Sequence, residues 1–210
     1  MCRSFFIFSL FYTLKIGITG GIGCGKSTVL KFLQANGVAC LSTDAVVRRL
    51  LSEDKSVISS VIQYFGTELK NKAGSVDRSS LAKIVFQSKS DLEWLESLLH
   101  PIVKKSCEAF FGVHETQLSC VEIPLLFEKR LEKEYDLVVS VISSDFNANI
   151  RLRLKGYSDM DIALRRQQQL PNSIKAERSS FVMSNDGSLN FLEQQIILLL
   201  STLKHHDYSV

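Results

Sequence analysis

The chain has 210 residues, 45% hydrophobic and 22% charged, which is the balance of an ordinary globular domain and excludes a disordered or fibrous chain. Its 25 Lys and Arg residues against 22 Asp and Glu residues give a formal net charge of +3, too small to indicate a nucleic-acid or membrane partner. No apolar run in the sequence reaches the roughly 18–20 residues of a membrane span. The length predicts one domain with room for an inserted subdomain.

The N-terminus carries an apolar run at 5–14, preceded by Arg3, that superficially resembles the core of a signal peptide. No small-residue cleavage site follows it, and the run leads directly into a predicted strand. We therefore expect residues 1–13 to be an N-terminal extension, or the product of an early start codon, and residues 14–210 to form the folded domain.

The five cysteines are an odd number, with neither a CxxC pair nor zinc-ligand spacing. Cys40, Cys107 and Cys120 lie within apolar patterns, where a free cysteine behaves as a small hydrophobic residue. Free thiols are typical of a reducing compartment, so a cytoplasmic location is expected.

Apolar, partly β-branched runs predict five strands, at 14–19, 38–41, 118–123, 136–142 and 181–184. Amphipathic patterns predict helices at 27–35, 45–51, 57–65, 79–87, 92–100, 102–111, 147–155, 160–169 and 188–204. Strands that alternate with helices favour parallel pairing in a doubly wound α/β sheet. The stretch at about 48–116 contains several helices and no good strand, so it is expected to be a helical insertion beside the sheet, able to hold a second substrate.

The pattern GxxxxGK[ST] is matched completely at 20–27. A predicted strand precedes it and a predicted helix follows it, which is the context that a phosphate-binding loop requires. Its glycines let backbone N–H groups point at a phosphate, Lys26 supplies a positive charge, and the Ser27 hydroxyl is able to ligate Mg²⁺. The residues expected to bind a nucleoside triphosphate are Gly21, Ile22, Gly23, Cys24, Gly25, Lys26, Ser27 and Thr28.

The loop alone leaves the use of the triphosphate open. The DxxG and NKxD motifs of GTPases are absent from the sequence, and Val121-Glu122 is only a weak version of the acidic strand end of ATPase motors. A small-molecule kinase is favoured, with a nucleoside or nucleotide kinase as the alternative within that class. A binding module that uses ATP only to change shape is the alternative from another class.

Asp44 follows the second predicted strand, at the sheet edge where the phosphate loop lies. A carboxylate there is able to accept or orient the proton of an attacking hydroxyl. The same residue type is also a good N-cap for the helix predicted at 45–51. The residues by themselves leave both roles open.

The chain resembles the dephospho-coenzyme A kinase family, in motifs that occur in the family's order from Leu14 to Ser188. The phosphate loop is generic, but the LLHP run at 98–101 and the PLLFE run at 124–128 on one chain are specific. Further matches are Asp44 with Arg48, Arg78, Leu81, Val85, Phe86, Arg151, Leu152, Arg165, Gln169, Lys175 and 185–188.

The resemblance implies a P-loop kinase fold over 14–210, with an acceptor-binding helical insertion and a helical lid at about 145–178. It implies that ATP, with Mg²⁺, phosphorylates the ribose 3′-hydroxyl of dephospho-CoA in the last step of coenzyme A biosynthesis. The implied catalytic residues are Asp44, Lys26 and Arg151, with Asn185 near the adenine of ATP and Ser27 on the metal. The implied acceptor-binding residues are Asp44, Arg48, Arg78, His100, Pro101, Pro124 and Leu125.

Several positions depart from the family pattern. Ser42 stands where the family has an additional acid before Asp44, and Glu122 replaces the usual Asp of the third strand. Lys155 replaces an Arg that the family often has in its lid, which keeps the charge and loses the bidentate geometry. Ser180 stands where an Asp is common. Structural roles stay open for His100 as a buried histidine, for Arg48 as a solvated charge, and for 124–128 as a strand-to-helix turn.

Overall fold

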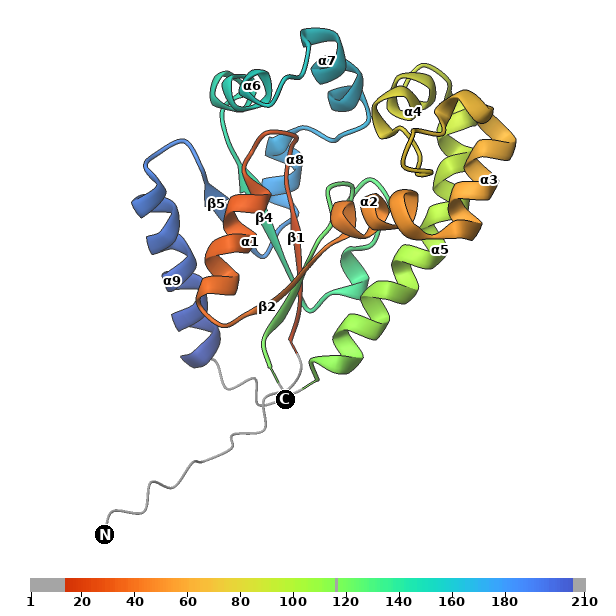
Figure 1. Ribbon diagram of the computed structural model, residues 1–210. Coiled ribbons are helices and arrows are strands. Elements are labelled where there is room, and N and C mark those ends of the chain that lie inside the picture. Colours follow the sequence, from red (N-terminus) through yellow and green to blue (C-terminus); the bar gives the residue numbers. More distant parts are fainter. Residues whose placement is uncertain (1–13, 116, 206–210) are drawn as a thin grey trace.

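The computed structural model describes residues 14–115 and 117–205. Its centre is one sheet of five parallel strands in the order β2-β3-β1-β4-β5 (Figure 1). This arrangement confirms the predicted fold class. The strands are β1 (Lys15–Thr19), β2 (Ala39–Ser42), β3 (Ser119–Glu122), β4 (Leu137–Ile142) and β5 (Phe181–Ser184). The expectation for residues 1–13 lies outside the described residues.

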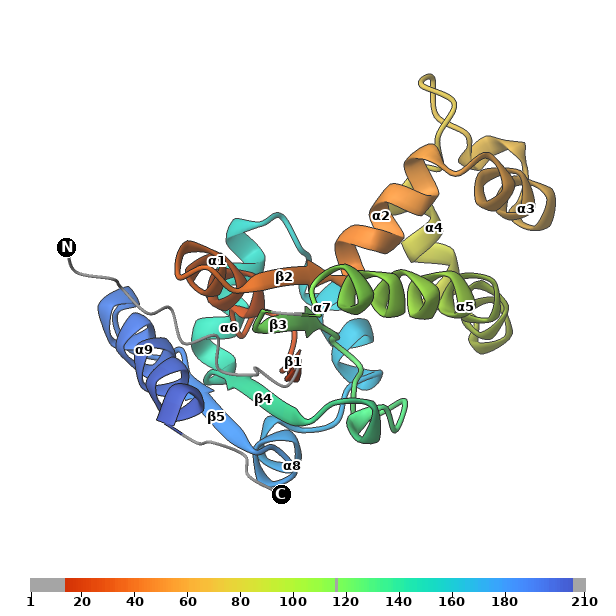
Figure 2. The same cartoon turned by 90° about the horizontal axis from the view of Figure 1, so that it is seen from below.

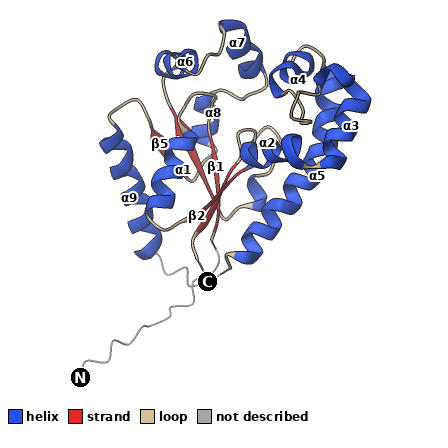
Figure 3. Cartoon of the chain, viewed as in Figure 1, coloured by secondary structure: helices blue, strands red, loops and turns tan. Residues whose placement is uncertain are grey.

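Helices cover both faces of the sheet and continue beyond its edge (Figure 3). They are α1 (Lys26–Ala35), α2 (Thr43–Glu53), α3 (Lys55–Phe65), α4 (Arg78–Val85), α5 (Lys89–Val113), α6 (Asp145–Leu154), α7 (Asp159–Gln167), α8 (Asn172–Glu177) and α9 (Leu189–His205). Short 3₁₀ turns lie at Thr67–Leu69 and Glu132–Glu134. None of the helices in the described ranges is both long and apolar enough to cross a membrane.

Three apolar clusters hold these layers together. Figure 2 shows α1 and α9 over one face of the sheet and α5 and α8 on the other. The first cluster fills the α1–α9 face around Ile18, Val29 and Ile196. The second joins α2, α3, α4 and the first half of α5 into the predicted insertion, and the third seats the second half of α5 on the sheet through Cys107 and Phe111. The insertion therefore has a core of its own and is anchored by α5.

The prediction of two helices separated at Pro101 was wrong, because α5 runs unbroken from Lys89 to Val113 with the proline inside it. A proline in a helix interior removes one hydrogen bond and costs about 3 kcal/mol. The apolar stripe of Leu95, Leu99, Cys107 and Phe111 packs into two of the clusters on both sides of the proline. This burial outweighs the local penalty, since tertiary packing contributes most of the stability of a helix in a protein.

The short helix α8 was not predicted. Its six residues are polar at most positions and give no clear apolar periodicity. Lys175 in this helix is nevertheless fully buried, because it has a specific ionic partner in the site described below. A buried lysine cannot be recognised from a hydrophobic pattern, since lysine is almost never fully buried unless it is paired.

Candidate active site

The phosphate loop connects β1 to α1 at the centre of the sheet, where the carboxyl ends of the parallel strands meet. Gly25 has φ +98° and forms the N-cap of α1, a conformation that other L-residues rarely adopt. A Cβ atom at Gly25 would also collide with the amide of Asn185. The glycine is therefore required for the turn and for the approach of a second segment to the loop.

Four backbone N–H groups of the loop have no acceptor among the hydrogen bonds of the described residues. They belong to Gly23, Gly25, Lys26 and Ser27. The first N–H groups of any helix lack intrahelical partners, and the helix dipole places partial positive charge there. The loop and the start of α1 consequently form a site suited to a phosphate group.

The first half of the loop is held in place by the segment that follows α7. The Gly21 N–H donates to Asn172 Oδ1 at 3.1 Å, and the Ile22 N–H donates to Gln169 Oε1 at 2.8 Å. Gln169 was noted from the sequence only as a family match, and Asn172 was missed. Neither role could be read from sequence spacing, because the two contacts join residues 151 and 147 positions apart.

Lys26 is buried within the loop, with its Nζ donating to the carbonyl oxygens of Gly20 at 3.0 Å and Gly21 at 3.1 Å. Burial lowers the pKa of Lys26 below its ordinary value, and the negative charges of Glu122 and Asp44 partly oppose that shift in pKa. The ammonium group is thus preorganised next to the free loop N–H groups and faces two carboxylates.

Arg151 and Asn185 brace the loop from the opposite side. The Asn185 side chain is buried and donates from Nδ2 to the Cys24 carbonyl at 2.8 Å. Arg151, in α6, donates to the Gly23 carbonyl at 3.3 Å, to Ser143 Oγ at 3.0 Å and to the Asn185 carbonyl at 2.5 Å. These contacts bring both sequence-predicted residues to the phosphate loop.

Asp44 lies in the first turn of α2 with an exposed carboxylate, and it does not cap the helix. Ser42 is the N-cap: its Oγ accepts from the Ala45 N–H at 3.4 Å. The capping role that the sequence left open for Asp44 is therefore wrong. Thr43 donates to the Glu122 carbonyl at 2.9 Å, which ties the start of α2 to the end of β3. Asp44 is left free to face the cavity.

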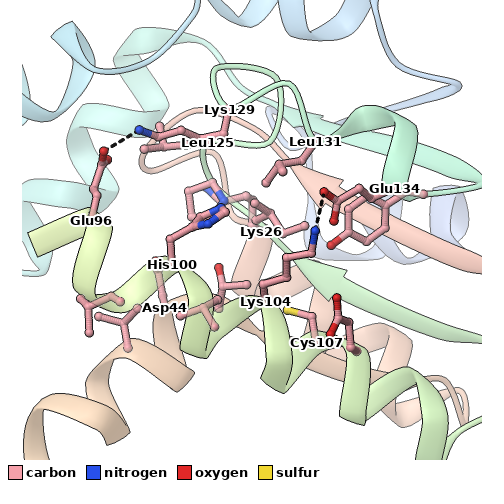
Figure 4. Close-up of a pocket in the computed structure, with 18 of the residues that line it drawn as sticks. Lys26, Asp44, Glu96, His100, Lys104, Cys107, Leu125, Lys129, Leu131 and Glu134 are labelled. Atoms are coloured by element: carbon pink, nitrogen blue, oxygen red, sulfur yellow. Dashed lines mark hydrogen bonds and ion pairs between the residues drawn. The ribbon is translucent and has the colours of Figure 1, made fainter. Parts of the chain in front are cut away.

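A cavity of about 1500 Å³ opens between the sheet edge, the helical insertion and the segment that contains Arg165, Gln168 and Gln169 (Figure 4). Of the sequence-predicted residues, it is lined by Lys26, Asp44, Ile22, His100, Pro124 and Leu125. Pro101, one residue beyond His100, is not among its lining residues. Arg48 and Arg78 line a separate, smaller hollow of about 630 Å³ instead. The structure thus brings the nucleotide loop, Asp44 and part of the predicted acceptor set together, and leaves the two arginines elsewhere.

A buried ionic network fixes the wall of the cavity formed by the turn after β3. Lys175 Nζ lies 2.8 Å from Glu128 Oε1 and donates to the Pro124 carbonyl at 2.9 Å. Glu128 Oε1 also accepts from the Leu170 N–H at 2.7 Å. The PLLFE run is consequently a turn, but it leads through a short 3₁₀ turn to β4 and not into a helix. Its Glu128 links the cavity wall to the segment that precedes α8.

The residues present fit a hard divalent cation that is bound together with a triphosphate. Ser27 has an exposed side chain at the start of α1, and the carboxylates of Asp44 and Glu122 both act on the neighbouring Lys26. Mg²⁺ usually takes one or two protein ligands and completes its coordination with phosphate oxygens and water.

The model of the family described as dephospho-CoA kinase matches residues 14–190. A dephospho-CoA kinase of Bdellovibrio bacteriovorus is 31% identical over 192 residues, which cover 90% of this chain and 96% of the relative. One from Corynebacterium glutamicum is 32% identical over 187 residues, covering 86% and 94%.

Two solved structures share the fold of this chain. The protein TT1252 from Thermus thermophilus has a TM-score of 0.77 at 32% identity and covers 91% of this chain and 98% of its own. A shikimate kinase from Acinetobacter baumannii, at 15% identity and a TM-score of 0.55, covers 93% and 98% and shares the fold alone.

Proposed function

The chain belongs to the dephospho-CoA kinase family, and on that premise we propose which residues transfer the γ-phosphoryl group of ATP to the ribose 3′-hydroxyl of dephospho-CoA. That transfer is the final step of coenzyme A biosynthesis. The observation that carries the proposal is the position of Asp44: its free carboxylate lines the same cavity as Lys26, at the carboxyl edge of the sheet.

Asp44 accepts or orients the proton of the attacking 3′-hydroxyl. Its position on the first turn of a helix, tied to β3 through Thr43, holds the carboxylate in place without occupying it with a cap. A positioned general base must lie within hydrogen-bond reach of the proton that it removes. An acceptor placed in the cavity between Asp44 and the phosphate loop meets this requirement.

The triphosphate binds to residues 21–28, with the unpartnered loop N–H groups on its phosphates and Lys26 on the oxygens that gain charge during transfer. Phosphoryl transfer needs mainly positioning and electrostatic stabilisation. The Ser27 hydroxyl would hold Mg²⁺, which would neutralise phosphate charge when bound. The carboxylates of Asp44 and Glu122 act on the neighbouring Lys26.

The remaining predicted residues have supporting roles. Arg151 contacts the loop at Gly23 and adds positive charge near the phosphates, and Asn185 fixes the loop on the side proposed for the adenine. His100, Pro124 and Leu125 line the acceptor side of the cavity. Contacts of Pro101, Arg48 and Arg78 with the acceptor remain predictions, since these residues lie outside that cavity in the structure described. A cytoplasmic location likewise remains a prediction from cysteine usage.

Asp44→Asn tests the proposal, because the change removes the negative charge and keeps the shape of the side chain. We expect kcat to fall by about 10²–10⁴-fold, the range of general-base contributions. The dissociation constant of ATP and the melting temperature should change little. Product formation is measured by mass spectrometry of dephospho-CoA incubated with ATP, Mg²⁺ and the enzyme.

Ser42→Ala is the matched control, since it removes the true cap of α2 two residues away. That variant should lose about 1 kcal/mol of stability and keep kcat within a few-fold. If Asp44→Asn phosphorylates dephospho-CoA within a few-fold of the wild-type rate, Asp44 is not the base. If the wild type forms no 3′-phosphorylated product, the assignment of the reaction itself fails.

A further inference from the structure

The four arginines of the segment 145–167, which contains α6 and α7, differ in their partners. Three of them have polar partners. These are Arg151 at the phosphate loop, Arg153 with Asp159 at 2.8 Å, and Arg166 with Asp145 at 3.2 Å. The fourth, Arg165, has a buried Nε atom that finds no hydrogen-bond partner among the described residues. Something other than a polar partner therefore holds this side chain.

The guanidinium of Arg165 lies against two aromatic rings. Its Cζ atom lies 4.6 Å from the ring centre of Phe86 and 5.1 Å from the ring centre of Tyr157. A guanidinium within about 6 Å of a ring centre is attracted by the negative face of the ring. The planar group also stacks on aromatic faces in a way that an ammonium group does not. The two rings consequently fix the position of Arg165.

The two rings belong to different parts of the molecule. Phe86 follows α4 and packs against the second apolar cluster, which is the core of the helical insertion. Tyr157 follows α6, and its N–H donates to the Leu152 carbonyl at 3.1 Å, so it belongs to the same segment as Arg165. Figure 1 shows α7 next to α4. Arg165 therefore joins the segment 145–167 to the insertion.

The end of α7 links the same arginine to the phosphate loop. Arg165 lies in the last turn of α7, and Gln169 follows one turn later. The Gln169 N–H donates to the Arg166 carbonyl at 2.9 Å, so the helical turn continues as far as Gln169. Gln169 Oε1 then accepts from the Ile22 N–H at 2.8 Å. One helical turn thus separates a contact with the insertion, at Phe86, from a contact with the phosphate loop.

We propose that Arg165 is a positioning residue that couples the binding of the two substrates. The proposal rests on the proposed function, in which ATP occupies the phosphate loop and dephospho-CoA contacts the insertion. An acceptor that fixes the insertion also fixes Phe86, and through Arg165 and Gln169 it fixes the loop at Ile22. The second substrate then meets a site that is already ordered. Because binding is reciprocal, each substrate raises the affinity for the other by the same factor, which we call the coupling factor.

Substitutions at each end of this contact test the proposal. Arg165→Met removes the cation and keeps an unbranched side chain. Phe86→Leu removes the ring and keeps an apolar side chain against the insertion core. Arg165→Lys keeps a cation for the Phe86 ring and loses the planar group. The matched control is Arg166→Met at the next residue, because it breaks the ion pair with Asp145 inside the segment 145–167 and leaves the aromatic contacts in place.

The readout is equilibrium binding, which does not depend on turnover. Isothermal titration calorimetry with Mg²⁺ gives the Kd of AMP-PNP, an ATP analogue whose terminal phosphoryl group is not transferred, without and with saturating dephospho-CoA. The reverse titration gives the Kd of dephospho-CoA without and with saturating AMP-PNP. The coupling factor from the two titrations must agree. Thermal unfolding checks that each variant is folded.

In the wild type we expect a coupling factor of at least about fivefold, the lower end of typical values. Arg165→Met and Phe86→Leu should each reduce it below about twofold, and the double variant should reduce it no further, because both remove the same contact. Arg165→Lys should give an intermediate value, and Arg166→Met should keep the wild-type factor. The Kd of each ligand measured alone should stay within about twofold of wild type in every variant, since Arg165 acts through the loop and the insertion.

An undiminished coupling factor in Arg165→Met would overturn the proposal, and so would a wild type in which neither ligand alters the affinity for the other. A larger rise in the Kd of either ligand alone would show that Arg165 contacts that ligand directly, which contradicts a positioning role. Equal loss of coupling in Arg166→Met would remove the special role of the aromatic contacts. None of these results would alter the assignment of the reaction, which depends on 3′-phosphorylated product formed by the wild type and lost in Asp44→Asn.

Discussion

The two substrate sides of the cavity are built in different ways. On the nucleotide side, the loop is short and its position is fixed by buried or partly buried hydrogen bonds from Gln169, Asn172, Arg151 and Asn185. On the side proposed for the acceptor, the cavity runs along the second half of α5 and is crossed by pairs such as Lys104–Glu134, whose side chains are about half exposed. Exposed ion pairs contribute little to stability.

This difference follows from the chemistry of each ligand. A triphosphate is compact and highly charged, so it is bound by a few donors that must already be in place. The acceptor proposed for the other side is much longer, so it needs an extended surface with many contacts. The side proposed for the nucleotide therefore depends on precisely placed donors, and the side proposed for the acceptor depends on shape and length.

The buried ion pair of Lys175 and Glu128 connects α8 to the turn that forms one cavity wall. Of the changes considered, breaking this pair should have the largest effect on the free energy of unfolding. Lys175→Met leaves the Glu128 carboxylate without its buried cation, and we expect a loss of about 3–5 kcal/mol in the free energy of unfolding, measured with urea. The double variant Lys175→Met/Glu128→Leu should recover much of that loss, because an apolar pair replaces the ion pair. A single variant as stable as wild type would show that the network does not hold the acceptor wall.

Lys26→Ala should remove chemistry on the nucleotide side without changing the fold. One preorganised charge is worth about 2.7–4 kcal/mol in the transition state, so kcat should fall by about 10²–10³-fold. The inhibition constant of AMP as an acceptor analogue should stay within a few-fold, because Lys26 serves the phosphates of ATP. Circular dichroism and thermal unfolding check the fold. Near-wild-type turnover in a folded Lys26→Ala protein would refute the phosphate-loop assignment.

Asp186→Asn should have the smallest effect, a pH-dependent loss of stability near the phosphate loop. Its carboxylate accepts from Asn147 Nδ2 at 2.8 Å, from Ser143 Oγ at 2.7 Å and from the Ser144 N–H, which holds the pKa of Asp186 well below its usual range. A carboxyl with a lower pKa in the folded state stabilises the protein above its unfolded pKa, near 3.8, and loses that contribution as the pH falls through the folded value. The stability difference between wild type and Asp186→Asn should therefore be present at pH 6 and smaller at pH 3. If wild type and Asp186→Asn differ in stability at pH 3 as much as at pH 6, this prediction is wrong.

The sequence by itself determined the sheet and the phosphate loop. Continuous apolar runs identify these strands because their side chains are buried between helices on both faces of the sheet. The glycines and Lys26 of the loop lie within the short segment 20–27, so their geometry is local. For this reason the five strands were predicted within one residue of their observed ends. The motifs at 98–101 and 124–128 were likewise sufficient to indicate the family.

Only the tertiary structure decided which residues meet around the cavity. Ser42, and not Asp44, caps α2 because the helix begins at Thr43, two residues earlier than the pattern suggests. Pro101 lies within one long helix because burial of its neighbours in two apolar clusters outweighs the lost hydrogen bond. Gln169 and Asn172 reach the loop, and Lys175 reaches Glu128, across long sequence separations. Such contacts depend on how the helices pack on the sheet, so no local sequence pattern predicts them.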